Sequence, residues 1–307
     1  GAVLATTAVA NGLFEGHARS VGISGGFSSP DAQRELEDAD VMIAFGAALN
    51  VWTTRHGRLT ADATLIQVDR DAEAIGAHRP VDLGVVGDAR LTAEALLAAV
   101  APREPRPVAT GRWRDEPYAE SRNGLDPRTL SIALDDLLPA ERTVVVDSGA
   151  FMGYPAMYLR VPDARGFVFP QAFQCVGLAL GTALGAAIAD PDRLTVCAVG
   201  DGGLAMSLPE LETLGRLAPN AVVVVYNDAA YGAEVHHFRP MGIPVELAQF
   251  PPTDFAALAR AAGCRGVTVR SVADLEGLPL GEGPLVLDAK VDPDICAEWL
   301  EEAFRGH

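Results

Sequence analysis

The chain has 307 residues, of which 49% are hydrophobic and 21% are charged, enough apolar material for about two globular domains. Its formal net charge is −17 and its isoelectric point is near 4.7. This acidic balance excludes nucleic acid as the main partner, because binding to a phosphate backbone requires a basic patch.

The cysteines and the hydropathy pattern predict a cytoplasmic protein. Cys175, Cys197, Cys264 and Cys296 lie far apart and mostly in apolar contexts, so we expect reduced, buried thiols rather than disulfides or zinc ligands. Residues 2–10 are apolar but lack the basic residues that begin a signal peptide. No apolar run reaches the length of a membrane span, so no membrane partner is expected.

Residues 1–101 alternate short apolar runs with helical patterns, which predicts an α/β domain with a parallel sheet. The expected strands are residues 2–6, 41–45, 64–68 and 84–86. The expected helices are residues 30–37, where Ser29 and Pro30 form a typical helix start, and 91–100. Strand ends near Phe45 and Val68 are of the kind that contacts a dinucleotide, but the chain has no GxGxxG motif.

Residues 102–124 are rich in proline, arginine and glutamate, which predicts an inter-domain linker with Trp113 as a candidate surface anchor. Residues 125–307 predict a second α/β domain. Its expected strands are residues 143–146, 166–169, 194–199, 221–226, 267–269 and 284–289. Its expected helices are residues 127–138, 173–189, 207–217, 255–262 and 295–304.

Two neighbouring strands of the second domain end in acidic residues. One β-branched run ends at Gly200 and Asp201, and the other ends at Asn227 and Asp228. The segment between them has a helical apolar spacing, so the three form a right-handed βαβ unit. Because ligands bind at the carboxyl ends of parallel strands, we expect Asp201 and Asp228 to lie across from each other.

This pattern suits a metal-bound diphosphate. Oxygens from Asp201, Asp228 and a backbone carbonyl can hold half of an octahedral Mg²⁺ shell, and phosphate oxygens and water can fill the rest. Gly202 and Gly203 lack a Cβ, so backbone N–H groups there can approach a phosphate closely. The alternative is an ordinary α/β turn, which a lone Gly-Asp-Gly would favour; the second acidic strand end favours the metal site instead.

These residues resemble the signature of thiamine-diphosphate (ThDP)-dependent enzymes, a Gly-Asp-Gly followed at a fixed interval by a pair usually written Asn-Asn. Asp228 follows Asp201 by 27 residues, which is the family's spacing. The resemblance covers residues 2–299 and is closest to the acetolactate synthase, benzaldehyde lyase and benzoylformate decarboxylase group. In the first domain it rests on ADVMIAFGAALN, TLIQVDRD and VVGDA.

The resemblance implies a fold of two doubly wound parallel-sheet domains: a Rossmann-like central domain lacking its first strand and helix, and a C-terminal domain that binds the ThDP diphosphate. It implies ThDP and Mg²⁺ as cofactors, with the side chains of Asp201 and Asp228 and the Ala230 carbonyl as metal ligands. Asp228 replaces the usual asparagine and adds a negative charge beside the diphosphate. The central domain binds FAD in acetolactate synthase but nothing in many relatives, so FAD is the less favoured expectation.

The remaining cofactor contacts are implied in the same way. The turn at Gly149, Ala150 and Phe151 matches the second turn with which the family binds the diphosphate. Val176 matches the apolar residue that bends the cofactor, although it is smaller than the usual Met, Leu or Ile, and the Gln174 carbonyl would accept a hydrogen bond from the pyrimidine amino group. Without the resemblance, Val176 would be read as a core residue.

Residues 231–238 follow the metal site, and the resemblance places this helix along the substrate pocket. Tyr231 is assigned to cofactor binding, and Ala233, Val235 and His237 are assigned to the substrate pocket. His237 stands where acetolactate synthases carry tryptophan, which indicates a different substrate. We do not expect a zinc site here, because adjacent histidines point to different helix faces, and Glu234 is interpreted as a solvated residue rather than an acid or base.

The resemblance implies an enzyme that makes or breaks a C–C bond next to a carbonyl, acting on a 2-oxo acid or a 2-hydroxy ketone. We interpret the chain as a fragment of such an enzyme, inactive alone. The family's activating glutamate lies in an N-terminal pyrimidine-binding domain and would reach the site from a partner subunit of a homo-oligomer. No catalytic acid or base is therefore assigned in this chain. The alternatives are half of a naturally split enzyme, a non-catalytic ThDP-binding or regulatory subunit, and a plain dinucleotide-binding protein.

Overall fold

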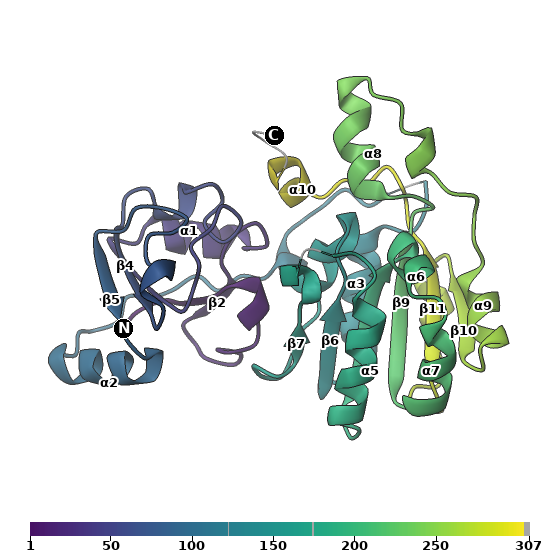
Figure 1. Cartoon of the computed structure of the whole chain (residues 1–307), viewed down its shortest axis with the longest axis horizontal. Coiled ribbons are helices and arrows are strands. Elements are labelled where there is room, and N and C mark those ends of the chain that lie inside the picture. Colours follow the sequence, from purple (N-terminus) through teal and green to yellow (C-terminus); the bar gives the residue numbers. More distant parts are fainter. Residues whose placement is uncertain (122, 174, 304–307) are drawn as a thin grey trace. The chain divides into compact units, whose positions relative to one another are not determined.

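The computed structural model describes residues 1–121, 123–173 and 175–303. The chain divides into two units, Gly1–Trp113 and Arg114–His307, and each is an α/β unit built on parallel strands (Figure 1). None of the helices within the described ranges is long and apolar enough to cross a membrane. The predicted fold class, α/β with parallel sheets, is confirmed.

The first unit contains two short parallel sheets. Its elements are β1 (Leu4–Thr6), β2 (Ser20–Ile23), α1 (Pro30–Glu37), β3 (Val41–Phe45), β4 (Thr64–Asp69), β5 (Leu83–Val86) and α2 (Ala89–Ala99). One sheet pairs β1 with β2, and the other has the order β3-β4-β5. Helix α1 begins as predicted, because Ser29 accepts a hydrogen bond from the Ala32 N–H (3.2 Å) ahead of Pro30.

The strand expected at residues 2–6 does not join the sheet of β3, β4 and β5. It pairs instead with β2, which was not predicted. The sequence signal of β2 is weak, because the strand has only four residues and its Gly22 adopts a left-handed φ of 79°. Val21 and Ile23 are nevertheless buried, so burial in the folded unit rather than local propensity stabilises this strand.

Residues 109–113 of the predicted linker pack along the first unit. The Trp113 indole N–H donates to the Phe27 carbonyl (2.8 Å), and the Gly111 N–H donates to the Asp31 carboxylate (2.8 Å). Ser29 also donates its hydroxyl to the Gly111 carbonyl (2.8 Å). Trp113 therefore anchors this segment as expected, and it does so on the unit that precedes it.

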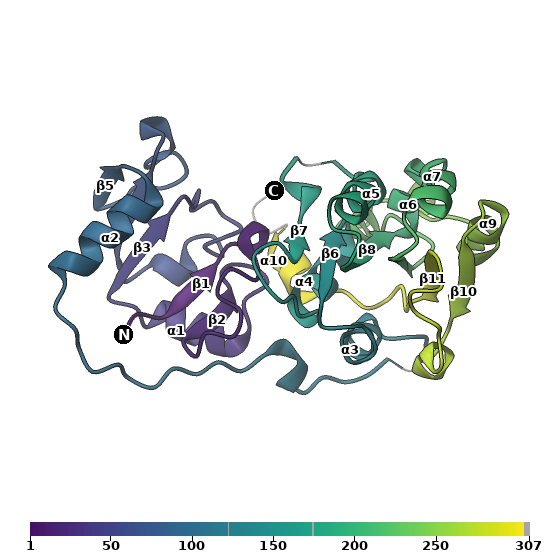
Figure 2. The same cartoon turned by 90° about the horizontal axis from the view of Figure 1, so that it is seen from below.

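The second unit is built on a six-stranded parallel sheet. Its elements are α3 (Pro127–Leu137), β6 (Arg142–Val146), α4 (Gly153–Tyr158), β7 (Phe167–Val168), α5 (Ala179–Ala189), β8 (Leu194–Gly200), α6 (Asp201–Met206), α7 (Glu210–Leu217), β9 (Ala221–Asn227), α8 (Gly232–Phe238), α9 (Phe255–Ala261), β10 (Arg265–Val269), β11 (Leu285–Lys290) and α10 (Glu298–Ala303). The strand order is β10-β11-β9-β8-β6-β7. Figure 2 shows α5 and α7 on one face of the sheet and α3 on the other.

The central strands β8 and β9 are buried on both faces. Val199 and Val223 face a core cluster formed with α5, α7 and α9, whereas the alternating residues Val196 and Val222, equally buried, are not part of that cluster. Burial on both faces explains why these strands are rich in apolar and β-branched residues along their length instead of alternating polar with apolar residues. Burying a valine side chain fully contributes about 1.5–3 kcal/mol to the free energy of unfolding, so the buried valines of β8 and β9 stabilise the sheet.

Three predicted helices have different bounds in the structure. Residues 173–189 shrink to α5, because Gly177 adopts a left-handed φ of 87° that cannot continue a helix. The helix predicted over residues 207–217 is shortened to α7, because Pro209 disfavours helical geometry at the residue before it. A separate short helix that was not predicted, α6, ends before this break. The last helix, expected at residues 295–304, covers only Glu298–Ala303 within the described residues.

The four cysteines are free thiols, but their exposure differs from the expectation. Cys197 and Cys264 are buried, Cys296 is half-buried, and Cys175 is exposed. Burial raises the pKa of the Cys197 and Cys264 thiols, so both stay protonated at neutral pH. Cys175 precedes Gly177, in the part of the predicted helix that lies outside α5.

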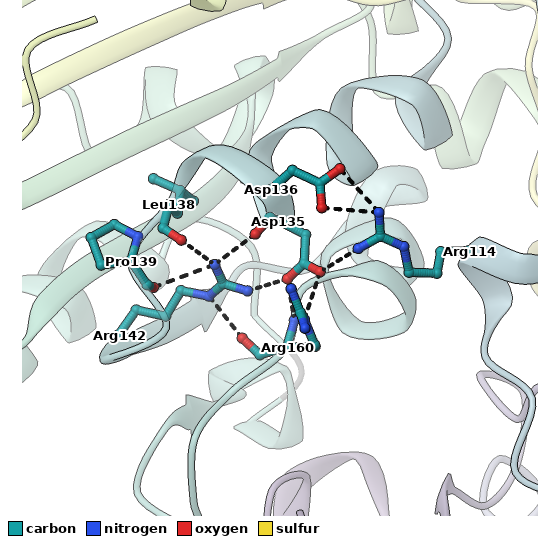
Figure 3. Close-up of polar contacts among 7 residues, drawn as sticks. All are labelled: Arg114, Asp135, Asp136, Leu138, Pro139, Arg142 and Arg160. Atoms are coloured by element: carbon teal, nitrogen blue, oxygen red, sulfur yellow. Dashed lines mark hydrogen bonds and ion pairs between the residues drawn. The ribbon is translucent and has the colours of Figure 1, made fainter.

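A buried carboxylate organises the polar contacts between α3 and its neighbours (Figure 3). Asp135 has a fully buried side chain and pairs with Arg142, which is also buried, with Arg160 (2.9 Å) and with Arg114 (3.1 Å). Arg142 also donates to the Arg160 carbonyl (2.7 Å) and the Leu138 carbonyl (3.1 Å). This Asp135 cluster joins α3 to the start of β6 and to the segment after α4.

Candidate functional site

A cavity of about 130 Å³ lies at the carboxyl ends of β6, β8 and β9. Its walls come from the turn after β6, from residues 200–203 after β8, and from residues 228–236 around the start of α8. Most of the residues predicted to bind cofactor or metal line this one cavity: Gly149, Ala150, Phe151, Val176, Asp201, Gly202, Gly203, Asp228, Ala230 and Tyr231. Gln174 lies outside the described residues.

The two acidic residues face each other across the cavity. The register of β8 and β9 pairs Gly200 with Tyr226, so Asp201 and Asp228 follow at the same edge, close enough for the Asp201 carboxyl to raise the pKa of Asp228. Asp201 is buried, and the Gly202 N–H donates to it (2.8 Å). None of the described residues that line the cavity is a lysine or an arginine. The negative charge here therefore has no cationic side chain opposite it.

The protonation of this pair reflects that lack of a counter-charge. Burial raises the pKa of Asp201 to about 6, and burial together with the Asp201 carboxyl raises the pKa of Asp228 to about 7. A divalent cation would oppose both effects, because its charge favours the ionised carboxylates. No group of three or more His, Cys, Asp or Glu that could hold a metal occurs among the described residues. A cation here would therefore need further oxygens, such as a backbone carbonyl, a phosphate or water.

The acidic pair predicts a pH-dependent stability in the absence of metal. Both folded pKa values lie above the unfolded value of about 3.9, so the pair's contribution is fully present below about pH 4 and is lost as the pH rises through 6 and 7. We expect Asp228→Asn to make the metal-free chain more stable than wild type by about 2–3 kcal/mol at pH 7.5 and by about 1 kcal/mol or less at pH 4.5. Urea unfolding in EDTA at both pH values measures this difference. A gain that is equal at the two pH values would contradict the assignment.

Glycines keep the cavity walls free of side chains. A Cβ on Gly202 would collide with the Tyr231 ring, and one on Gly232 would collide with the Asp228 carboxyl. A Cβ on Gly203 would collide with the Asp147 carboxyl. A side chain at any of these three positions would have to displace its neighbour, and each glycine exposes backbone that can approach a bound group closely.

Asp147 is a positioning residue that the sequence analysis missed. It lies at the end of β6, fully buried, and accepts a hydrogen bond from the Gly177 N–H (2.9 Å). This bond holds the segment before α5 against the end of β6. The same segment approaches α6, since a Cβ on Gly203 would lie 3.4 Å from Val176 Cγ1. Burial raises the pKa of Asp147, and several backbone N–H groups oppose that effect. The only sequence signal for this role was a carboxylate at a buried strand end.

The two members of the Asn-Asp pair have different tasks. Asp228 lines the cavity, whereas Asn227 is buried and donates its amide to Asp288 on β11 (2.8 Å). The Asn227 carbonyl accepts the Val291 N–H (3.1 Å). Asn227 therefore fixes the end of β9 to the neighbouring strand, and Asp228 faces the site.

The turn between Asp228 and α8 contains a strained residue, and residues 248–250 support it through hydrogen bonds and a ring contact. Ala229 adopts a left-handed φ of 56°, which is unusual for a residue with a Cβ. The Phe250 N–H donates to the Ala229 carbonyl (2.7 Å), and the Tyr231 N–H donates to the Ala248 carbonyl (2.8 Å). The Tyr231 and Phe250 rings also meet edge-on at 4.7 Å. Residues 248–250, to which the sequence analysis assigned no role, therefore support the turn.

Helix α8 presents different residues to the cavity from those expected. Ala233 lines it, as predicted. Val235 is buried and His237 lies against the Phe238 ring (4.8 Å), and neither is among the described lining residues. Glu234 and His236 line it instead. Burial and the nearby Arg239 lower the pKa of His236, which favours its neutral form.

Comparison with known proteins identifies the family. Residues 1–96 match the family model described as the thiamine pyrophosphate enzyme, central domain, and residues 147–278 match the model described as the thiamine pyrophosphate enzyme, C-terminal TPP binding domain. The chain belongs to the ThDP-dependent enzyme family. The acidic cavity therefore lies in the domain that the family model describes as ThDP-binding, which confirms the resemblance drawn from the sequence.

Several relatives of this ThDP-family chain are known. It is 29% identical to a sulfoacetaldehyde acetyltransferase of Castellaniella defragrans, over 80% of this chain and 47% of the relative. It is 30% identical to the acetolactate synthase large subunit of Parasynechococcus marenigrum (strain WH8102), over 86% of this chain and 45% of the relative. The chain thus spans about half the length of the curated relatives it matches.

A solved structure shares the fold. The ThDP-dependent 4-hydroxybenzoylformate decarboxylase of Rhodococcus jostii RHA1 matches with a TM-score of 0.69 and 23% identity. The match covers 85% of this chain and 50% of the decarboxylase. At this identity the likeness supports the fold of the ThDP-family chain and not its substrate.

Proposed function

We propose that this chain carries the diphosphate- and metal-binding part of a ThDP- and Mg²⁺-dependent enzyme that makes or breaks a C–C bond next to a carbonyl. The substrate class is a 2-oxo acid or a 2-hydroxy ketone. The relatives support this range, since they include an acetyltransferase and a synthase, and the structural neighbour is a decarboxylase.

The observation that carries the proposal is the pair of carboxylates, Asp201 buried and Asp228 half-buried, in a cavity whose described lining has no lysine or arginine. Asp201 and Asp228 would hold Mg²⁺ together with the Ala230 carbonyl, and the metal would neutralise both the pair and a diphosphate. Asp228 in place of asparagine adds one negative charge, so this chain should depend strictly on the metal for cofactor binding.

The other lining residues suit the parts of ThDP. Gly149, Ala150 and Phe151 would meet the phosphates with backbone N–H groups, and Gly202 and Gly203 leave room for their approach. Val176, next to Gly203, would support the cofactor from below. When bound, ThDP supplies a carbanion that adds to the substrate carbonyl and an electron sink for the product.

The activation step is assigned to residues outside this chain. Glu234 is the one glutamate among the described lining residues, and it is exposed. In this proposal the family's activating glutamate comes from a pyrimidine-binding domain of a partner subunit in a homo-oligomer, and the 307-residue chain alone is inactive. Decarboxylation of pyruvate or benzoylformate by the chain alone would contradict this part of the proposal.

Titration with ThDP tests the proposal directly. We expect the 307-residue chain to bind ThDP in 5 mM Mg²⁺ and to show no measurable binding in EDTA, because the acidic pair repels an uncompensated diphosphate. Isothermal calorimetry at pH 7.5 measures both conditions. Thiamine without phosphates is the matched control and should bind weakly in either. Equal ThDP affinity with and without metal would contradict the assignment of Asp201 and Asp228 as Mg²⁺ ligands.

A further inference from the structure

The C-terminal helix of the second unit packs directly against the start of α4. Trp299 of α10 is 5% exposed, and its indole lies against Gly153, the first residue of α4. A Cβ on Gly153 would lie 2.6 Å from Trp299 Cδ1 and 2.8 Å from Cε2, both too short for atoms that are not bonded to each other. Gly153 has an ordinary helical φ of −67°, so the indole, rather than the backbone conformation, excludes a side chain here.

This glycine makes α4 dependent on its packing. Glycine is less favourable than alanine in a helix, because it loses more backbone freedom on folding. Helix α4 has only six residues, with Pro155 among them, so its hydrogen bonds alone hold it weakly. The position of its first residue therefore depends on neighbouring side chains, and Trp299 is the nearest of these to Gly153.

The contact lies beside the turn that is proposed to bind the diphosphate. Gly153 directly follows the short helical turn Ala150–Met152. Within that turn the Phe151 ring stacks on Tyr226 of β9, with 5.2 Å between the ring centroids, which ties the turn to the sheet. Trp299 holds the residue at the other end. The turn is thus fixed by β9 at Phe151 and by α10 at Gly153.

The chain between β11 and α10 belongs to the cavity wall. Val291, Asp292 and Ile295 line the cavity. The Asp292 N–H donates to the Leu125 carbonyl (3.0 Å), and its carboxylate accepts a hydrogen bond from the Ser121 hydroxyl. Helix α10 is therefore the end of a segment that is anchored beside the cavity, runs along its wall and ends against the start of α4.

We propose that Trp299 is a positioning residue for diphosphate binding, whose indole fixes Gly153 and thereby the backbone N–H groups of Gly149, Ala150 and Phe151. This inference rests on the proposed function. Trp299 acts through the turn and not on the ligand, because it is not among the described residues that line the cavity. The inference gives the C-terminal helix a part in cofactor binding that no motif in its sequence indicates.

Titration of the 307-residue chain with inorganic pyrophosphate in 5 mM Mg²⁺, followed by calorimetry, tests this role. Trp299→Ala should bind about 10-fold more weakly than wild type, because the turn loses one of its fixed ends. Trp299→Phe keeps an aromatic ring and should bind within about threefold of wild type. Leu300→Ala is the matched control, because Leu300 is equally buried on the same helix, and it should bind within about twofold. Circular dichroism at the titration temperature checks that each variant is folded.

The contact between Gly153 and Trp299 gives a second test that does not require removal of the indole. Gly153→Ala places a methyl group against the indole and should weaken pyrophosphate binding by about fivefold or more. In the Trp299→Ala background the same methyl group has room, so it should change the affinity by less than about twofold. Such non-additivity is expected if the indole acts through Gly153.

Each other outcome overturns the inference. Wild-type affinity in Trp299→Ala, an equal loss in Leu300→Ala, a full loss in Trp299→Phe, or additive effects of the two substitutions would show that Trp299 supports the fold without positioning the turn. If Trp299→Ala does not fold, Trp299→Leu takes its place in both comparisons. If Asp201→Ala loses pyrophosphate binding while Trp299→Ala keeps it, only the role of Trp299 falls. If wild type does not bind magnesium pyrophosphate, the proposed function falls with it.

Discussion

Replacing Asp201 with alanine is expected to weaken magnesium-dependent ThDP binding by about 100-fold or more. The substitution removes one of two facing carboxylates and leaves Asp228 as the only acidic side chain at the metal position. One carboxylate and a backbone carbonyl hold Mg²⁺ poorly against water, and without the metal the remaining charge repels a diphosphate. Calorimetric titration of ThDP in 5 mM Mg²⁺ measures the loss.

Two further variants make this result specific. Asp201→Asn keeps an oxygen ligand and the approximate volume but removes the charge, so it should bind more weakly than wild type and more tightly than Asp201→Ala. Glu212→Ala removes an exposed carboxylate of the same unit, one that pairs with Arg216, and should bind ThDP as wild type does. Normal ThDP binding by Asp201→Ala would rule out its role as a metal ligand.

The second large effect concerns stability. We expect Asp135→Ala to lower the free energy of unfolding by about 3–5 kcal/mol, because it leaves the buried guanidinium of Arg142 without its carboxylate. Arg160 and Arg114 lose the same partner, although both are more exposed and contribute less. Urea denaturation followed by circular dichroism measures the change.

The neighbouring acid provides the control for this prediction. Asp136 pairs with the same Arg114 but is 57% exposed, so Asp136→Ala should cost less than about 1 kcal/mol. The double variant Asp135→Leu with Arg142→Met removes both buried charges and should recover part of the loss. If Asp135→Ala and Asp136→Ala cost the same, the Asp135 cluster is not a stabilising centre.

The parts of the fold that the sequence predicted well have strong local signals. Helix α1 has a serine cap and a proline at its first position, and β8 and β9 are continuous runs rich in apolar and β-branched residues. The acidic strand ends could be placed together for the same reason, since parallel neighbours bring their carboxyl ends to one edge of the sheet. The metal roles of Asp201 and Asp228 remain predictions.

The features that the sequence did not reveal depend on contacts between distant segments. Strand β2 has too few residues to carry a pattern, and helix α4 has only six, with Pro155 among them. Asp147 acquires its role only when Gly177, 30 residues away, folds against it. The support of residues 248–250 for the Ala229 turn is likewise a long-range pairing without a motif. The resemblance assigned Val235 and His237 to the substrate pocket, whereas Glu234 and His236 line the cavity described here.

The strand order of the second unit delays completion of its sheet during synthesis of the chain. Strand β11 inserts between β9 and β10, so one edge of β9 remains unpaired until residues 285–290 leave the ribosome. Asn227 then finds Asp288, and the turn that holds Asp228 becomes fixed at its base. Pairing at such sequence separation is slow and leaves an apolar edge open to association in the meantime. A nascent chain that stalls before residue 285 would contain Asp201 and Asp228 but lack β11, the strand that fixes the position of Asp228 relative to Asp201.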